Sequence, residues 1–181
     1  MEVAAVKFVE GRETERFVTL VDPGERIPYE ATAVHGITAA MVRGKPRAEQ
    51  VLQDFKVFIE NSVLVAHYAA FDLRIVNDEL QRVRLSLLKN AHVCTRNLAR
   101  AHLNLHSYRL EDVARHLGVL KRAQEHRALG DVLLVAAVYH KLQEHAGRAV
   151  ETIPVATRSA AKGTRSARVS RPARSRRAVR S

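Results

Sequence analysis

Two short stretches of this sequence each place a histidine five residues before an aspartate. Residues 65–72 read VAHYAAFD and contain His67 and Asp72, and residues 125–131 read EHRALGD and contain His126 and Asp131. Carboxylates are the oxygen ligands that hard divalent cations prefer, and a histidine near neutral pKa can accept a proton from water. The chain has nine histidines and nineteen acidic residues, so coincidence is the simplest alternative to a metal-dependent hydrolytic centre. The surroundings of each pair must decide between the two.

Each aspartate is predicted to lie near the start of a helix. Asp72 follows an apolar strand that ends near Ala66, and ligands of open α/β sheets collect outside the carboxyl ends of strands. The structural alternative is an acid that simply favours a helix N-terminus. Asp131 lies near the start of the last helix, where five residues on one helix would separate side chains by about 140°. His126 can therefore approach Asp131 only from the loop leading in; the local alternative is an ordinary surface histidine.

The elements that position these residues read as strands first, then strands alternating with helices. Two β-rich runs predict an antiparallel hairpin of residues 2–9 and 15–21, with its turn around residues 10–14. SVLVAH, residues 62–67, is a short apolar run typical of a strand buried on both faces of a parallel sheet, and it should pair with residues 91–94. Apolar periodicity predicts helices after Pro46, after Asp72, and from about Ala128 to His145. This order indicates an α/β fold with a mixed sheet.

Length and composition limit the classes of protein to which this chain can belong. A chain of 181 residues with 46% hydrophobic content is long enough for one domain with a hydrophobic core. The single cysteine, Cys94, excludes an internal disulfide and suits a reducing compartment. The sequence has no run of eighteen apolar residues and no signal-peptide pattern at its start, so we expect a cytoplasmic protein without a membrane partner.

The net charge of +11 is concentrated near the C-terminus. Residues 146–181 contain ten Arg or Lys against one acid, Glu151, whereas the rest of the chain is near +2. Beyond about Val155 the sequence is rich in Arg, Ser, Ala and Thr and has little to bury, which predicts a disordered segment. We therefore expect a domain over residues 1–146 and a basic tail over residues 147–181. Such a tail can attract phosphate backbones without reading sequence, or it can be functionally idle.

Together, the ordered motifs V-A-H-x-A-x-F-D, Y-R-L-x-x-V-A-x-H-L-G and H-R-A-L-x-D resemble the DEDDh (DnaQ-like) class of 3′–5′ exonucleases. These are relatives of the bacterial DNA polymerase III epsilon (proofreading) subunit. The stretch VTLVDPGERIPYEATAVHGIT is also similar to the segment before that family's first long helix. The resemblance covers about residues 1–145 and implies a ribonuclease H-like fold, with a mixed sheet flanked by helices.

The resemblance also implies a site and a chemistry. Asp72 and Asp131 would be metal-ligating carboxylates, and His126 would be the general base. Two Mg²⁺ or Mn²⁺ ions would activate water and neutralise charge during hydrolysis of a nucleotide from a nucleic-acid 3′ end. Residues along the path of the terminal nucleotide would be His35, Gly36, Ile37, His67 and Phe71. DNA and RNA both fit as substrates, with a DNA polymerase subunit as a further partner.

One family motif is missing from the sequence. The family's first strand carries D-x-E upstream of a strand that MEVAAVKF resembles, and Glu2 matches an acid that is not a metal ligand in the family. We therefore expect a domain truncated at its first, central strand, with the hairpin unpaired from the remaining sheet. With two of four carboxylates absent, the chain as written should be inactive or very weak; a start codon placed too late, or a fragment of a longer gene, would explain this. A smaller departure is Tyr68, where the family commonly has Asn.

Three functional interpretations remain open at this point. The first is an exonuclease domain of the DNA proofreading or repair type whose full gene product is active. The second is a catalytically dead nucleic-acid-binding module that acts through its basic tail. The third, a non-enzymatic α/β interaction domain with accidental histidine motifs, fits the ordered series of motifs poorly.

Overall fold

An antiparallel hairpin opens the chain. The computed structural model describes residues 1–120, 127–147 and 153–154, and its first strands are β1 (Glu2–Val9) and β2 (Arg12–Leu20). The predicted hairpin is confirmed, but its turn is tighter than expected. Glu10 and Gly11 both adopt positive φ (51° and 78°), so two residues reverse the chain where five were predicted. A bulge opposite Lys7 and Phe8 absorbs the extra residue in β2.

A second sheet has the order β3-β4-β5, formed by β3 (Leu64–Ala66), β4 (Ala91–Cys94) and β5 (Ile153–Pro154). β3 and β4 are parallel, with Leu64 opposite His92 and Ala66 opposite Cys94, as the sequence predicts. The expectation that β3 is buried on both faces is wrong: its residues are half-buried and Val63 just before it is 48% exposed. Within the described residues β3 pairs along one edge only, which leaves it less covered than an interior strand.

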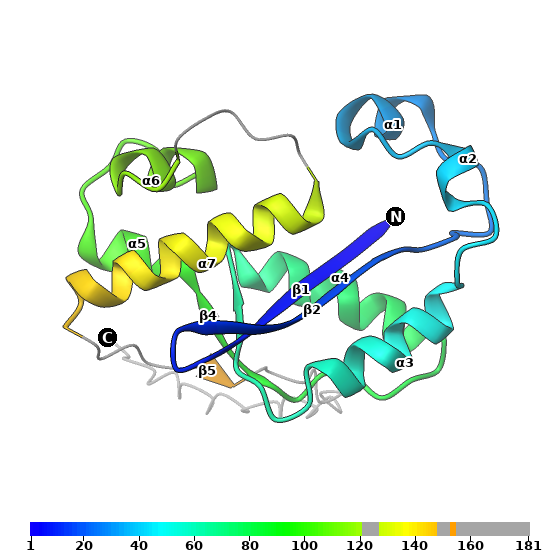
Figure 1. Cartoon of the computed structure of the whole chain (residues 1–181), viewed down its shortest axis with the longest axis horizontal. Coiled ribbons are helices and arrows are strands. Elements are labelled where there is room, and N and C mark those ends of the chain that lie inside the picture. Colours follow the sequence, from blue (N-terminus) through cyan, green and yellow to red (C-terminus); the bar gives the residue numbers. More distant parts are fainter. Residues whose placement is uncertain (121–126, 148–152, 155–181) are drawn as a thin grey trace, which may run out of the picture.

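The two sheets are joined by a helix and not by strand pairing. Among the described strands, no hydrogen-bonded pairing links the hairpin to the second sheet, in agreement with the expectation for this region. Helix α7 (Ala128–His145) contacts both β1 and β3, and Figure 1 shows it running across the two sheets. The packing of α7, together with a core shared with α3 and α4, holds the hairpin against the rest of the fold.

Six further helices complete the described structure: α1 (Tyr29–His35), α2 (Ala39–Val42), α3 (Ala48–Phe58), α4 (Ala69–Arg82), α5 (Thr95–His102) and α6 (Leu110–His116). One core packs Val21, Phe55 and Leu80 among the hairpin, α3 and α4. The other packs α5 and α6 against α7. Apolar residues at helical spacing produce both cores, because they place one face of each helix inside.

The predicted domain boundary at residue 146 lies directly after the end of α7. α7 ends at His145, and Ala146 caps it by donating its backbone N–H to the Leu142 carbonyl. Of the predicted tail, the structure describes Gly147 and β5, and β5 pairs antiparallel with β4. The remainder of residues 147–181 lies outside the described residues. No helix in the described part of the chain is long and apolar enough to span a membrane.

Candidate functional site

The turn HGIT is held in one conformation by three internal hydrogen bonds. α1 ends at Gly36, which adopts φ 69°, a left-handed conformation that glycine takes without a steric penalty. The backbone N–H of Ile37 donates to Nδ1 of His35 at 3.0 Å, so this ring nitrogen carries no proton. The Thr32 hydroxyl donates to the Ile37 carbonyl at 3.1 Å, and Thr38 caps α2 by accepting from the Met41 N–H. These hydrogen bonds define the conformation of the turn.

An open groove of about 400 Å³ joins this turn to the start of α7. His35 and Ile37 line it from the turn, and Ala128 and Asp131 line it from the first turn of α7. Figure 1 shows α1 and α2 at the same end of the molecule as the start of β1. The structure thus brings together two predicted substrate residues and one predicted metal ligand, which lie almost a hundred positions apart in the sequence.

Glu2 fixes the start of α7 to β1. Its Oε1 accepts from Nη2 of Arg127 at 2.7 Å, and its Oε2 accepts from Nε of Arg127 at 3.1 Å and from the Ala128 N–H at 3.0 Å. The Glu2 side chain is only 8% exposed. The hydrogen bonds from Arg127 hold the pKa of the Glu2 carboxyl below its usual range, more than its burial raises that pKa. A carboxylate at the N-terminus of a helix is also favoured by the helix dipole.

Asp72 lies in the first turn of α4, as predicted. Solvent reaches its side chain, yet enough protein surrounds the carboxyl for desolvation to raise its pKa. Asp72 is not among the residues that line the groove beside Asp131. His126 lies outside the described residues. The convergence of Asp72, His126 and Asp131 therefore stays a prediction.

His67 connects three elements through both of its ring nitrogens. Nε2 lies 2.9 Å from the Tyr108 carbonyl, which can only accept, so Nε2 carries the proton. Nδ1 lies 2.9 Å from the hydroxyl of Thr95, a fully buried side chain. Burial lowers the pKa of His67, with a smaller contribution from the nearby Arg96 charge, so the neutral ring fits this geometry. Both ring nitrogens are therefore engaged within the protein, which leaves neither for a hydrogen bond to a nucleotide.

Phe71 is the most exposed of the predicted substrate residues other than Gly36, at 47% exposure. Its ring stacks on that of Tyr68, with centroids 6.1 Å apart and an interplanar angle of 7°. Tyr68 precedes α4 with φ 67°, a conformation in which a non-glycine residue is uncommon. The two rings are therefore presented side by side on the surface.

The described residues supply only part of a metal centre. Among residues 1–120 and 127–147, no three His, Cys, Asp or Glu side chains lie together in a way that could hold a metal ion. Glu2 is engaged by Arg127 and Ala128, and a bidentate contact with a guanidinium competes directly with metal binding. The donor set of the described residues does not fit a two-ion centre.

Comparison with known proteins assigns the family. Residues 1–139 match the exonuclease family model RNase_T. The chain belongs to the DnaQ-like 3′–5′ exonuclease family. A DNA polymerase III subunit epsilon from Aquifex aeolicus is 35% identical to this exonuclease-family chain over 145 residues, which cover 80% of the chain and 71% of the relative. A DNA polymerase III of the PolC type from Clostridium perfringens is 40% identical over 139 residues, and there the match spans only 10% of the relative.

Solved structures agree with the family assignment. Exonuclease X in complex with 5′ overhanging duplex DNA is 28% identical and superposes with a TM-score of 0.64, covering 81% of this chain and 83% of that one. A full-length 3′-exonuclease superposes with a TM-score of 0.70 at 18% identity and supports the fold alone. The predicted ribonuclease H-like exonuclease fold is confirmed.

Two features of this exonuclease-family site were not foreseen from the sequence. One is the ion pair between Glu2 and Arg127, whose partners are 125 positions apart. The other is the surface pair of Tyr68 and Arg96, in which the guanidinium lies 4.8 Å from the ring centroid. The unusual Tyr68 within the V-A-H-x-A-x-F-D motif was the available signal for the second.

Proposed function

We propose that this chain is a 3′–5′ exonuclease domain that hydrolyses nucleotides from the 3′ ends of DNA. The observation that carries the proposal is the groove that is lined both by Asp131 and by the turn residues His35 and Ile37. A terminal nucleotide seated there would have an apolar wall, Ile37, against its base or sugar and a carboxylate near its phosphate. The similar solved structure of exonuclease X is a complex with DNA, which supports DNA over RNA as the substrate.

The roles of the site residues follow from their chemistry. Asp72 and Asp131 would ligate Mg²⁺ or Mn²⁺, because hard cations prefer carboxylate oxygens. His126 would accept the proton of the attacking water. Gly36 and Phe71 would contact the terminal nucleotide alongside His35 and Ile37. His67 would keep the backbone of Tyr108 in place and present its ring edge to the substrate.

We further propose that residues 1–181 alone do not form a working two-ion centre. Two carboxylates are too little negative charge to hold two dications a few ångströms apart. Glu2 is a poor substitute, since Arg127 and Ala128 occupy both of its oxygens. No metal-dependent step is therefore assigned to this chain by itself.

A nuclease assay tests the proposal. Single-stranded DNA labelled at its 5′ end should remain intact with the 181-residue chain in Mg²⁺ or Mn²⁺. A chain extended upstream of Met1 with a D-x-E strand should shorten the labelled DNA strand stepwise from its 3′ end. In that extended chain Asp131→Asn should abolish cleavage, because an amide is a poor ligand for a dication.

Matched controls make the outcome specific. Asp54→Asn changes an exposed acid on α3, hydrogen-bonded to Gln50, and should leave cleavage unchanged. Strong Mg²⁺-dependent cleavage by residues 1–181 would overturn the proposed incomplete centre. Intact substrate with a folded, extended chain would overturn the exonuclease proposal itself.

The basic C-terminal sequence favours a second candidate, a binding module that acts without hydrolysis. The concentration of Arg and Lys after residue 146 suits contacts with phosphates of any sequence. Salt-dependent DNA binding without cleavage by the extended chain would select this candidate. Association with a DNA polymerase is also proposed from the names of the relatives, and co-purification with a polymerase subunit would test it.

A further inference from the structure

A continuous row of aromatic and arginine side chains crosses the surface from α4 to α5. We name it the aromatic–arginine strip, and its members are Arg74, Phe71, Tyr68, Arg96, Arg100 and Tyr108. Arg74 lies 5.6 Å from the Phe71 centroid, and Arg96 lies 4.8 Å from the Tyr68 centroid. Arg100 is one helical turn beyond Arg96 on α5 and lies 5.5 Å from the Tyr108 centroid.

Two rings of the strip, Tyr68 and Phe71, and the neighbouring Ile75 are exposed, whereas the third ring, Tyr108, is half-buried against the core of α5, α6 and α7. Tyr68 is 50% exposed, Phe71 47% and Ile75 39%, and their spacing places them on one face of α4. Contiguous exposed apolar side chains rimmed by polar groups mark interaction sites more often than isolated ones do. Tyr68 also holds a positive φ of 67°, so its exposed ring is kept in a backbone conformation that disfavours it.

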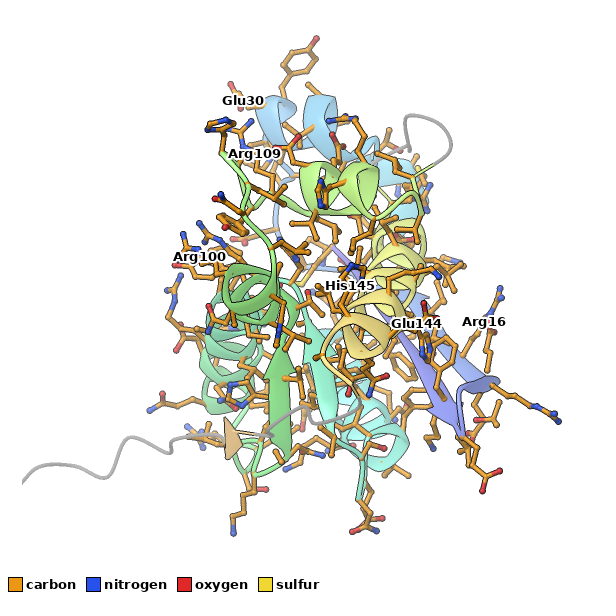
Figure 2. All side chains as sticks on the ribbon, turned by 90° about the vertical axis from the view of Figure 1, so that its left-hand side faces the viewer. Arg16, Glu30, Arg100, Arg109, Glu144 and His145 are labelled. Atoms are coloured by element: carbon orange, nitrogen blue, oxygen red, sulfur yellow. The ribbon has the colours of Figure 1, made fainter. Side chains whose placement is uncertain are left out.

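The charge of the strip selects the kind of ligand. Three arginines flank the rings. Arg74 forms an ion pair with Asp78 at 3.8 Å, and both side chains are more than 60% exposed. Exposed pairs of this kind are weak and leave the guanidinium available to a stronger anion. Figure 2 shows Arg100 pointing away from the ribbon on the same side of the molecule as Arg109, a further cation. Flat rings between planar cations suit stacked bases joined by phosphates.

We propose that the aromatic–arginine strip binds unpaired bases of a single-stranded nucleic acid by stacking, with Tyr68 as the principal contact. The inference rests on the proposed function, because Phe71 immediately precedes the proposed metal ligand Asp72 and so places the strip beside the proposed centre. Arg96 lies 4.8 Å from the centroid of the Tyr68 ring and orients that ring, and a base stacks on the Tyr68–Phe71 pair. The strip holds the strand upstream of the nucleotide to be removed.

The test compares two strands that differ only in their bases. The parent chain, in EDTA to prevent hydrolysis, is titrated against a fluorescent oligothymidylate and against an abasic strand of equal length, with anisotropy as the readout. Contacts between phosphates and the basic tail are common to both strands, so the difference in affinity isolates the bases. The parent chain should bind the oligothymidylate more tightly than the abasic strand.

Substitution of Tyr68 is the decisive variant. Tyr68→Asn removes the ring and keeps a residue that adopts positive φ readily, so the start of α4 is not disturbed. Affinity for the oligothymidylate should fall on the order of tenfold, with affinity for the abasic strand unchanged. Tyr68→Phe should restore parent affinity, and Arg96→Lys should give a smaller loss because it keeps charge but not the planar contact.

Controls and contrary outcomes complete the experiment. Tyr29→Ala removes an 82% exposed ring on α1, outside the strip, and should change neither affinity. Phe71→Leu provides a second test if Tyr68→Asn lowers the thermal stability. Equal affinity of parent and Tyr68→Asn for oligothymidylate, or an equal loss of affinity for both strands, would overturn the proposal that the strip stacks bases. The exposed rings would then be assigned to contact with a protein. Because no hydrolysis is measured, a failed nuclease assay would not alter this result, nor would a failed strip alter that assay.

Discussion

The carboxylate of Glu2 couples the first strand to the first turn of the helix that carries Asp131. Glu2→Gln would remove the negative charge that Arg127 and the Ala128 N–H share. Hydrogen bonds to charged groups contribute about 1.5–3 kcal/mol, and the amide retains part of the geometry, so we expect a loss of about 1–2 kcal/mol in the free energy of unfolding at neutral pH. Urea unfolding of the two proteins measures it.

The same substitution has a defined pH dependence. The pKa of Glu2 is lowered in the folded chain, so its contribution is present above the pKa of the unfolded carboxyl and is lost as the pH falls through the folded pKa. The stability difference between parent and Glu2→Gln should therefore shrink in acid. Glu13→Gln, which alters a more exposed pair with Arg16, is the matched control: the Glu13 pKa is lowered in the same direction by Arg16, but solvent screens the pair, so its trend should be much smaller. A difference that grows with acidity would contradict the assigned ion pair.

The sequence predicted the positions of residues along the elements better than it predicted the contacts of their side chains. The sequence predicted that Asp131 lies near the start of the last helix, and the structure has it in the first turn of α7. The partners of Glu2 and His67 could not be predicted from the sequence. An acid on a strand and a histidine at the end of a strand each have many possible contacts, and the tertiary structure decides among them. Tyr108 accepts from His67 through its backbone carbonyl, an atom that every residue carries, so no side-chain pattern could reveal it.

At the scale of elements, α7 is the helix that contacts both sheets and the helices α5 and α6. Its buried face carries Leu134, Val138 and Leu142, which pack against α5 and α6, while the helix also contacts β1 and β3. Leu142→Ala should lower the free energy of unfolding by about 2–5 kcal/mol, because Leu142 is fully buried and its loss leaves a cavity. Chemical denaturation measures the change.

A matched aliphatic control lies on α3. Val57 is 74% exposed, and Val57→Ala should change stability by less than about 0.5 kcal/mol. Equal effects at the two positions would contradict the role assigned to α7.

Element boundaries show where periodicity succeeds and where it fails. The helix over residues 128–145 was predicted to the residue, since its apolar positions recur over many turns. The hairpin turn was predicted too wide, because the β-rich run that starts at Arg16 does not extend back over Arg12 to Glu15, where all four side chains are exposed. β3 was predicted too buried, because an apolar run cannot reveal whether both neighbouring positions in the sheet are occupied by strands.

At the scale of the whole molecule, charge and fold are separated along the chain. Residues 155–181 carry nine Arg or Lys and no acid, so the remaining 154 residues are close to neutral. Attraction to phosphates is thus concentrated in a segment distinct from the groove and from the aromatic–arginine strip. Binding strength and chemistry should therefore respond to different changes.

Removal of residues 155–181 tests this separation and keeps β5, which pairs with β4. Each cation that neutralises a phosphate on a single strand adds about 0.7 to the slope of log affinity against log salt. The shortened chain should bind single-stranded DNA more weakly at low salt, with a shallower slope, and the two chains should converge as salt rises. In chains extended with the D-x-E strand, the rate of cleavage at saturating DNA should be the same with and without residues 155–181. An unchanged salt slope would place the dominant phosphate contacts on the folded domain, with the arginines of the strip as the first positions to substitute.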